Sequence, residues 1–249
     1  MAEPGALGQE RTDPMERDPA HRTPLLHNAV PDPARRNPDL PLRACLLSGG
    51  ESRRMGRDKA LLPHAEGGTW LERTLALLGQ LALPITLFSR HASHRQLAQA
   101  WAATAAVAHL EAVAEPPPWE GPLLALQRLS ERYPDERLLL CPVDMPALDA
   151  GSVAALVAAA ARDPTLIHLA DDGERLQPLL AVVPTTAALR ARLAAAVAGG
   201  ERRLQRWLLT QPHRAVRLDA TALRNCNRPG EISPDPAPPA GPAPAPAPA

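Results

Sequence analysis

The 249-residue sequence is poor in aromatic side chains, with four Trp, one Tyr and one Phe. Proteins that bind single-stranded nucleic acid stack bases on aromatic surfaces, and this chain has few residues for that purpose. Lysine and arginine together number 27, as do aspartate and glutamate, so no overall field attracts the chain to nucleic acid or to an anionic membrane. A charge-based function must therefore depend on a local cluster, and we expect no nucleic-acid partner and no membrane partner.

Cysteine is also scarce, because Cys45, Cys141 and Cys226 are the only three and lie far apart in the sequence. Their odd number and wide spacing argue against a disulfide framework and against a C-x-x-C zinc site, and favour a reducing compartment. The longest apolar run, Val153 to Ala161, is too short for a membrane span, which needs about 20 apolar residues. We therefore expect a soluble, cytoplasmic protein.

Proline is abundant, with 30 residues, and its uneven placement divides the chain into three zones. Residues 1–40 mix proline with charged residues and show no apolar period, so they cannot bury enough surface to offset the entropy of ordering. Residues 233–249 form a low-complexity tail of proline and alanine that favours extended polyproline II conformers. The sequence therefore predicts one folded domain over 41–232, between two disordered tails.

Short apolar runs alternate with helical patterns inside that domain. The runs at 44–48 and 137–141 are continuous, which is typical of strands covered on both faces of a parallel sheet. Further strands are expected at 85–88, 107–110, 166–169, 179–183 and 215–218, and helices at 70–83, 96–101, 123–132, 153–162, 186–197 and 201–209. This alternation predicts an α/β fold with a Rossmann-like, mostly parallel central sheet and helices on both faces.

A glycine-rich loop with four cations directly follows the first strand. The segment Ser48-Gly-Gly-Glu-Ser-Arg-Arg-Met-Gly-Arg-Asp-Lys59 contains three glycines, which let the backbone approach a ligand, and the cations Arg53, Arg54, Arg57 and Lys59. Ligands of such sheets bind beyond the carboxyl ends of the strands, so this composition favours a phosphate site. The segment matches neither the Walker motif nor Gly-x-Gly-x-x-Gly. A bare double glycine indicates an ordinary surface loop, whereas four cations within seven residues favour phosphate binding.

Asp144 lies in the segment Cys-Pro-Val-Asp-Met-Pro, directly after the apolar run at 137–141. Two prolines restrict the backbone there, which would aim the carboxylate at a fixed point beside the glycine-rich loop. Magnesium is bound by one or two carboxylates together with substrate phosphates, so Asp144 is a candidate Mg²⁺ ligand. Taken alone, Asp144 fits a cap of the following turn equally well. The cationic loop expected beside it favours the magnesium role.

The segment at 47–59, Leu-Ser-Gly-Gly-Glu-Ser-Arg-Arg-Met-Gly-Arg-Asp-Lys, resembles the signature of the molybdenum cofactor guanylyltransferases, bacterial enzymes of a nucleotidyltransferase superfamily. Four further segments agree in order: Gly-Pro-Leu at 121–123, the Asp144 segment, Gln-Pro-Leu at 177–179 and Asn-Cys-Asn at 225–227. The resemblance spans about residues 42–232. It implies transfer of GMP from GTP to molybdopterin carrying molybdenum, with Mg²⁺ as cofactor and pyrophosphate as product. It also implies a molybdenum-insertion protein or a molybdoenzyme chaperone as a further partner.

The resemblance also implies roles for individual residues. By position, Leu47, Ser48, Gly49 and Gly50 would border the guanine and ribose, Arg54 would contact the triphosphate, Lys59 the α-phosphate and Asp144 the magnesium, while Glu115, Asn225 and Asn227 would assist binding. The attacking phosphate is already anionic at neutral pH, so no general base is needed and catalysis depends on positioning and charge neutralisation. Arg54, Lys59 and Asp144 are the expected catalytic residues.

Two alternatives remain open. The sister cytidylyltransferases of the same cofactor use CTP and usually carry Ala where Gly49 stands, so we expect the missing methyl to leave space for the wider guanine. A non-catalytic nucleotide-binding scaffold with a proline-rich peptide ligand is the other alternative. The presence of Lys59 and Asp144 argues against a scaffold.

Other polar residues receive weaker assignments. His91 and His94 follow a predicted strand together with Arg90, and no cysteine or carboxylate stands at metal spacing, so we expect a solvated polar cluster. Arg202 and Arg203 lie in an ordinary helix connection that also resembles a family segment facing the second substrate. They are therefore candidates for contacts with the pterin phosphate.

Overall fold

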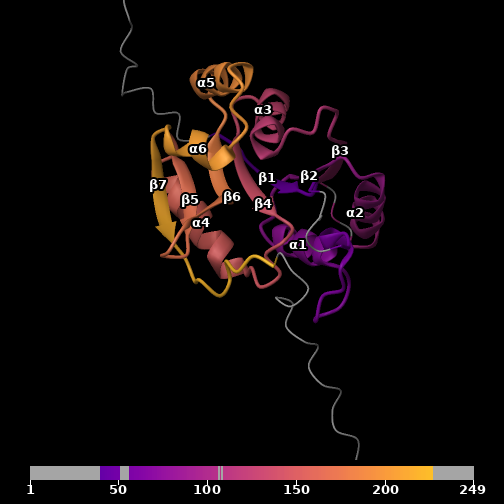
Figure 1. The fold of residues 1–249 in the computed structure, drawn as a ribbon. Helices are drawn as coiled ribbons and strands as arrows, with labels where there is room; N and C mark the ends of the chain where they lie inside the picture. Colours follow the sequence, from indigo (N-terminus) through magenta and orange to yellow (C-terminus); the bar gives the residue numbers. More distant parts are fainter. Residues whose placement is uncertain (1–39, 51–55, 106, 108, 227–249) are drawn as a thin grey trace, which may run out of the picture. The chain divides into compact units, whose positions relative to one another are not determined.

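Seven strands form one sheet in the computed structural model, which describes residues 40–50, 56–105, 107 and 109–226. The strands are β1 (Leu42–Leu47), β2 (Ile85–Ser89), β3 (Leu110–Ala114), β4 (Arg137–Pro142), β5 (Ile167–Asp171), β6 (Leu176–Pro184) and β7 (His213–Arg217). Their order is β3-β2-β1-β4-β6-β5-β7 (Figure 1). The pairings β1–β2, β1–β4, β2–β3 and β5–β7 are parallel, whereas β6 is antiparallel to both β4 and β5. The prediction of a mostly parallel sheet is confirmed.

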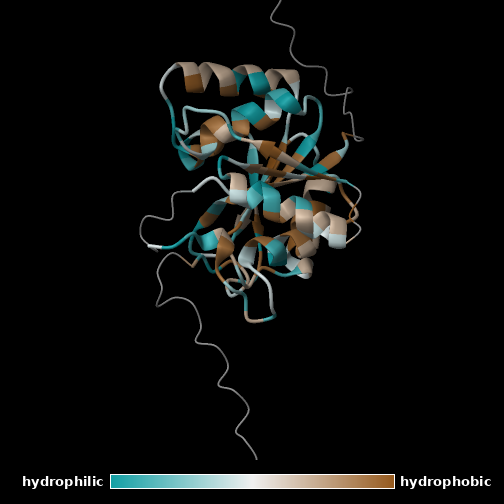
Figure 2. Ribbon diagram, turned by 90° about the vertical axis from the view of Figure 1, so that its right-hand side faces the viewer, coloured by the Kyte–Doolittle hydropathy of each residue, from teal (hydrophilic) through white to brown (hydrophobic). Residues whose placement is uncertain are grey.

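Helices cover both faces of the sheet, as the alternating pattern predicts. On one face pack α1 (Trp70–Gly79), α2 (Ala92–Thr104) and α4 (Ala150–Arg162), and on the other α3 (Pro122–Arg132), α5 (Ala187–Ala198) and α6 (Leu204–Leu209). In β1, the buried residues Ala44 and Leu46 join the first apolar cluster, and Cys45 joins the second. Burial on both faces explains why this run is continuous rather than alternating. Figure 2 shows apolar residues concentrated in the central strands.

Local signals explain where two of these helices begin. Thr69 and Glu72 form a capping box before α1, in which the Thr69 backbone N–H donates to Glu72 Oε2 at 2.7 Å and the Glu72 N–H donates to Thr69 Oγ1 at 3.2 Å. Gly121 precedes α3 with φ of 99°, a conformation that is strained for any residue with a Cβ, and Pro122 occupies the first helical position. The start of α3 is thereby fixed close to the end of β3.

The third predicted strand is wrong in position, because β3 covers Leu110–Ala114 rather than 107–110. Glu111 interrupts the apolar pattern inside this strand, and its carboxylate accepts hydrogen bonds from Arg132 and from Tyr133 Oη. β3 lies at one edge of the sheet, where a polar side chain can reach such partners. The apolar signal of this strand is weak for that reason.

The helix ends differ from the prediction by a few residues. α1 stops at Gly79 rather than at 83, since the chain turns there and Ala82 adopts a positive φ of 52°. α2 begins at Ala92, immediately after the second strand and its short connection, rather than at 96. None of the helices formed by the described residues is long and apolar enough to cross a membrane.

The described residues belong to one unit of the chain, Asn37–Ala249, whereas the other unit, Met1–Arg36, lies outside them. The predicted tails therefore lie outside the described residues, apart from Leu40. Arg54 and Asn227, two of the predicted site residues, also lie outside them.

Candidate active site

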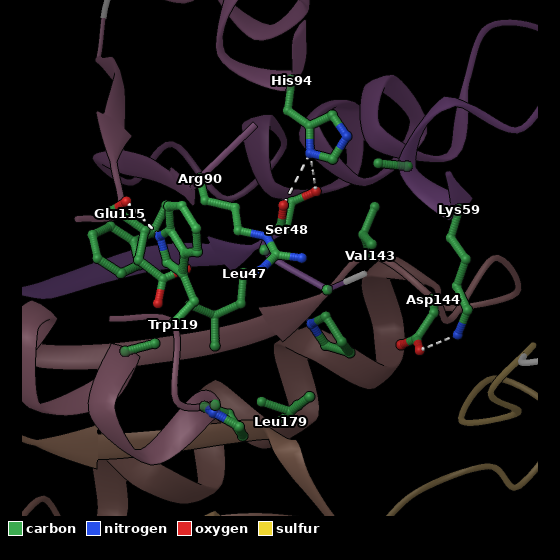
Figure 3. A pocket seen from close by; sticks show the side chains of 18 of the residues that line it. Leu47, Ser48, Lys59, Arg90, His94, Glu115, Trp119, Val143, Asp144 and Leu179 are labelled. Carbon is green, nitrogen blue, oxygen red and sulfur yellow. Dashed lines mark hydrogen bonds and ion pairs between the residues drawn. The ribbon is translucent and has the colours of Figure 1, made fainter. Parts of the chain in front are cut away.

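A pocket of about 510 Å³ lies at the carboxyl ends of β1, β2, β3 and β4 (Figure 3). Residues 47–50 line it from the end of β1, residues 58–60 from the turn that follows the glycine-rich loop, and residues 142–144 from the end of β4. Glu115 and Trp119 line it from the segment after β3. This is the edge of the sheet at which the sequence predicts ligand binding.

Lys59 and Asp144 contact each other in this pocket. Lys59 Nζ donates to Asp144 Oδ2 at 3.0 Å, and the two side chains are 13% and 23% exposed, so a ligand can still reach them. Lys59 begins a 3-10 turn, η1 (Lys59–Leu61), which Asp58 caps. Asp144 follows β4, and its backbone carbonyl accepts from the Cys226 N–H at 2.9 Å. The fold thus joins two predicted catalytic residues that are 85 positions apart.

Lys59 is the only lysine in the sequence, since all the other basic side chains counted with it are arginines. An arginine presents a planar fork of donors, whereas a lysine presents a compact point charge on a flexible stem. This single lysine places its compact charge against the Asp144 carboxylate, just beyond the end of a parallel strand. It also means that an amine-selective reagent directed at side chains reports on this one residue.

The carboxylate of Glu115 lies against Gly49. A Cβ added at Gly49 would come within 2.6 Å of Glu115 Oε2, whereas a Cβ added at Gly50 would meet no atom within 4 Å. The expectation of open space beside Gly49 is therefore wrong, because Glu115 occupies that space. The missing methyl of Gly49 instead allows the carboxylate to approach the backbone of the glycine-rich loop.

Glu115 is a buried carboxyl group with two arginines nearby. It is 9% exposed, and burial raises the pKa of its carboxyl, while Arg128 and Arg90 oppose that rise. Arg128 Nη1 lies 3.5 Å from Glu115 Oε1, and Trp119 Nε1 donates to the Glu115 backbone carbonyl at 3.0 Å. The Arg90 guanidinium lies 5.2 Å from the centre of the Trp119 ring. A buried acceptor beside an aromatic surface suits a flat polar ring that carries N–H donors.

Arg90 and Trp119 line the pocket, although sequence reasoning missed them as site residues. Arg90 comes directly after β2, whose carboxyl end meets the same edge of the sheet as β1. The rule that selected the residues after the first and fourth strands would have selected Arg90 as well. No sequence signal marked Trp119, a large side chain that remains 51% exposed.

The prediction of a solvated cluster is wrong for His94, which is 1% exposed and lines the pocket. His94 Nε2 lies 2.7 Å from Asp58 Oδ2, and Nδ1 lies 2.9 Å from both the hydroxyl and the carbonyl oxygen of Ser48. Ser48 is itself only 3% exposed, and its hydroxyl lies against the His94 ring. His91 is partly exposed, with Nε2 at 3.3 Å from the Gly50 carbonyl.

Asn225 lies near the pocket without lining it. Its Nδ2 donates to Gln177 Oε1 at 2.9 Å, and Gln177 in turn donates to Asp172. The next residue, Cys226, binds the backbone of Asp144. Asn225 and Cys226 are therefore brought beside the predicted magnesium segment.

The two arginines predicted to face the second substrate are placed differently from each other. Arg202 is partly buried, where its Nε donates to Glu120 Oε2 at 2.6 Å and its Nη1 donates to the carbonyls of Val197 and Glu201. Arg203 is exposed. Neither residue lines the pocket, so their predicted contact with a pterin phosphate stays a prediction.

The carboxylates of the pocket can hold a magnesium ion only if oxygen atoms of a bound substrate also coordinate it. Among the described residues, no three His, Cys, Asp or Glu side chains gather closely enough to bind a metal ion. Asp144 offers a single hard oxygen donor group beside the Lys59 ammonium. Magnesium accepts one carboxylate when phosphate oxygens and water complete its shell. The donor set therefore fits Mg²⁺ together with a bound triphosphate.

Comparisons with known proteins give a family and close relatives. Residues 44–215 match the family model of the MobA-like NTP transferase domain. The chain is 36% identical over 196 residues to a probable molybdenum cofactor guanylyltransferase of Rhodopirellula baltica, which covers 78% of this chain and 91% of the relative. It is 31% identical over 196 residues to the molybdenum cofactor guanylyltransferase of Ectopseudomonas mendocina, which covers 76% of this chain and 89% of the relative.

Solved structures show the same fold at much lower identity. A molybdopterin-guanine dinucleotide biosynthesis protein A from Archaeoglobus fulgidus superposes with a TM-score of 0.55 and 16% identity, covering 76% of this chain and 94% of that chain. A 4-diphosphocytidyl-2C-methyl-D-erythritol synthase from Anaerococcus prevotii superposes with a TM-score of 0.59 and 11% identity, covering 78% of this chain and 95% of that chain. The predicted fold class is confirmed.

Proposed function

The chain belongs to the MobA-like NTP transferase family and is a nucleotidyltransferase, and we propose that it transfers GMP from GTP to molybdopterin carrying molybdenum. One observation carries this proposal. Lys59 contacts Asp144, and both residues line the same pocket as the glycines that follow β1. The relatives named molybdenum cofactor guanylyltransferase supply the substrate class.

The phosphate end of the pocket needs little covalent chemistry from the protein. An oxygen of the molybdopterin phosphate forms a bond to the α-phosphorus of GTP, the bond between the α-phosphorus and the bridging oxygen breaks, and pyrophosphate leaves. The attacking oxygen is already anionic, so the barrier is charge repulsion and alignment. Lys59 binds the α-phosphate and offsets its charge. The resemblance assigns Arg54, which lies outside the described residues, to the triphosphate. Magnesium held by Asp144 and phosphate oxygens would supply further positive charge.

The base end of the pocket favours guanine through Glu115. Guanine presents a ring N–H and an amino group side by side, and an ionised carboxylate accepts hydrogen bonds from both. Cytosine presents an unprotonated ring nitrogen next to its amino group, which would face the carboxylate with a lone pair. Burial raises the pKa of the Glu115 carboxyl, whereas Arg128 and Arg90 stabilise its ionised form and oppose that rise. Leu47 and the two glycines after Ser48 would border the base and the ribose.

GTP is therefore the expected donor. We expect kcat/KM for GTP to exceed that for CTP or ATP by roughly 10²-fold, because the wrong base leaves two buried hydrogen-bonding groups unpaired. The measurement is pyrophosphate release by the full chain with each nucleotide, Mg²⁺ and a single preparation of molybdopterin carrying molybdenum. A preference for CTP would assign the sister cytidylyltransferase activity. No release from any nucleotide, by a protein that unfolds cooperatively, would favour the scaffold.

Gly49→Ala tests the base end separately. The new methyl would approach Glu115 Oε2 to 2.6 Å, and because that atom is the far end of a flexible side chain, the carboxylate should move while the fold persists. We expect the preference for GTP over CTP to fall by about tenfold, the effect of one misplaced charged hydrogen bond. Gly50→Ala is the matched control, since its methyl meets nothing within 4 Å, and its effect should be smaller. An unchanged preference in Gly49→Ala would remove Glu115 from base selection.

A further inference from the structure

His94 contacts residues at both ends of the segment 48–58. It lies in the first turn of α2 and is 1% exposed. Its Nε2 is 2.7 Å from Asp58 Oδ2 at one end of the segment. Its Nδ1 is 2.9 Å from the carbonyl oxygen of Ser48 at the other end, with Ser48 Oγ at 2.9 Å and Ser89 Oγ at 3.1 Å. One buried ring thus bridges two residues that lie ten positions apart in the chain.

The hydrogen-bond partners determine where the ring protons lie. The Ser89 hydroxyl donates to the Ser48 carbonyl at 2.6 Å and accepts from the His91 N–H at 3.1 Å, so it offers His94 only an acceptor. The Ser48 carbonyl and the Asp58 carboxylate can only accept. Both ring nitrogens of His94 therefore face acceptors, which is satisfied when each nitrogen carries a proton. A proton donated from Ser48 Oγ to Nδ1 would instead set the Nδ1 lone pair 2.9 Å from the Ser48 carbonyl oxygen.

His94 lies among one anionic and several basic side chains. Asp58 provides the negative charge in direct contact. The His91 ring lies 4.7 Å away, and its pKa is lowered, first by burial and then by repulsion from His94. Arg95 donates to the Ser89 carbonyl at 2.8 Å, and the Nε of Arg90 donates to His91 Nε2 at 3.4 Å.

Asp58 connects His94 to the catalytic lysine. Asp58 Oδ1 accepts from the Ala60 N–H at 3.1 Å and so caps the turn η1, in which Lys59 is the first residue. Asp58 Oδ2 is held by His94. The orientation of the Asp58 carboxylate therefore fixes both the turn and the direction from which Lys59 reaches Asp144.

We propose that His94 is a positioning residue whose doubly protonated ring clamps Ser48 to Asp58 and thereby holds Lys59 in place for the triphosphate. The proton arrangement depends on the fold alone, whereas the consequence for the triphosphate rests on the proposed function. Neutral His94 cannot donate to both ends of the segment. Loss of its second proton therefore loosens the turn that carries Lys59 without unfolding the domain.

Nitrogen NMR of the full chain labelled in histidine tests the proton arrangement without any substrate. Near pH 7, both ring nitrogens of His94 should show the chemical shifts of protonated nitrogens, with His94→Gln identifying the signals. In Asp58→Asn, the amide can donate to Nε2, so one ring nitrogen should become unprotonated while the Nδ1–H bond to Ser48 is kept. An unprotonated nitrogen on His94 in the parent protein would overturn the proposal, and so would unchanged signals in Asp58→Asn.

Kinetics test the effect on the nucleotide. His94→Gln should raise KM for GTP by about tenfold, with a smaller effect on kcat, because one charge-assisted hydrogen bond is lost. His213→Gln is the matched control, since His213 lies in β7, its Nδ1 is 2.8 Å from the Gln211 carbonyl oxygen, and it does not line the pocket. The control should match the parent protein. An equal KM in His94→Gln and the parent would overturn the proposal.

If the parent uses no GTP, the proposed function fails, and the NMR measurement still decides the proton arrangement.

Discussion

Lys59→Ala should lower kcat/KM by about 10²-fold or more, the effect of removing a preorganised donor at a site of developing charge. The free energy of unfolding should change little, because Lys59 contacts a carboxylate in the pocket and does not belong to the apolar core. Lys59→Arg should recover only part of the loss, since the planar fork does not replace a point charge.

The single lysine makes this prediction measurable in a second way. An amine-selective reagent should modify Lys59 in the free protein, and GTP with Mg²⁺ should protect it, which peptide mass spectrometry can follow. Chemical denaturation of the variant and the parent gives the matched comparison of stability. Turnover of Lys59→Ala close to that of the parent, or modification of Lys59 that GTP does not slow, would contradict the assignment of Lys59 to the phosphate.

Asp144→Asn should lower kcat/KM by a similar factor of about 10² at ordinary magnesium concentrations, because the amide keeps the shape but removes the charge that holds a hard cation. Raised magnesium should restore part of the activity. The fold should persist, since the Cys226 N–H binds the Asp144 backbone carbonyl, which the variant keeps. The measurement is kcat/KM over a magnesium titration.

Asp149→Asn is the matched control for this change. Asp149 caps α4 by accepting from the Ser152 N–H at 2.8 Å, and it does not line the pocket. The control should therefore lower stability without changing the magnesium titration. If Asp144→Asn gives the same titration as the parent, the magnesium ligand lies elsewhere, and Glu115 and Asn227 become the next candidates.

The sheet and its ligand-binding edge could be predicted because their signals are local. The runs at 44–48 and 137–141 are apolar without interruption since each strand is buried on both faces. The residues after them meet at one edge because the two strands are parallel neighbours. That is why Lys59 and Asp144 were expected together. The sequence did not indicate that β6 runs antiparallel to β4, because a strand buried on both faces shows the same apolar run in either direction.

The contacts that sequence could not predict depend on side chains brought together from distant elements. The carboxylate of Glu115 fills the space beside Gly49, and nothing in either segment indicates that distance. His94 is buried because α2 begins at Ala92, which turns its first residues toward the end of β1. The charged residues near His94 in the sequence led to the prediction that it is solvated. The sequence therefore indicated the chemistry of the pocket but not how its polar groups pair.

The fate of the α-phosphorus tests the central claim most directly. The full chain is incubated with Mg²⁺, molybdopterin carrying molybdenum and GTP that is labelled either at the α-phosphorus or at the γ-phosphorus, and the products are separated. We expect the α label in a molybdopterin dinucleotide that contains guanine, and the γ label in pyrophosphate. No α label in the pterin product, or incorporation from CTP in preference to GTP, would contradict the proposed function.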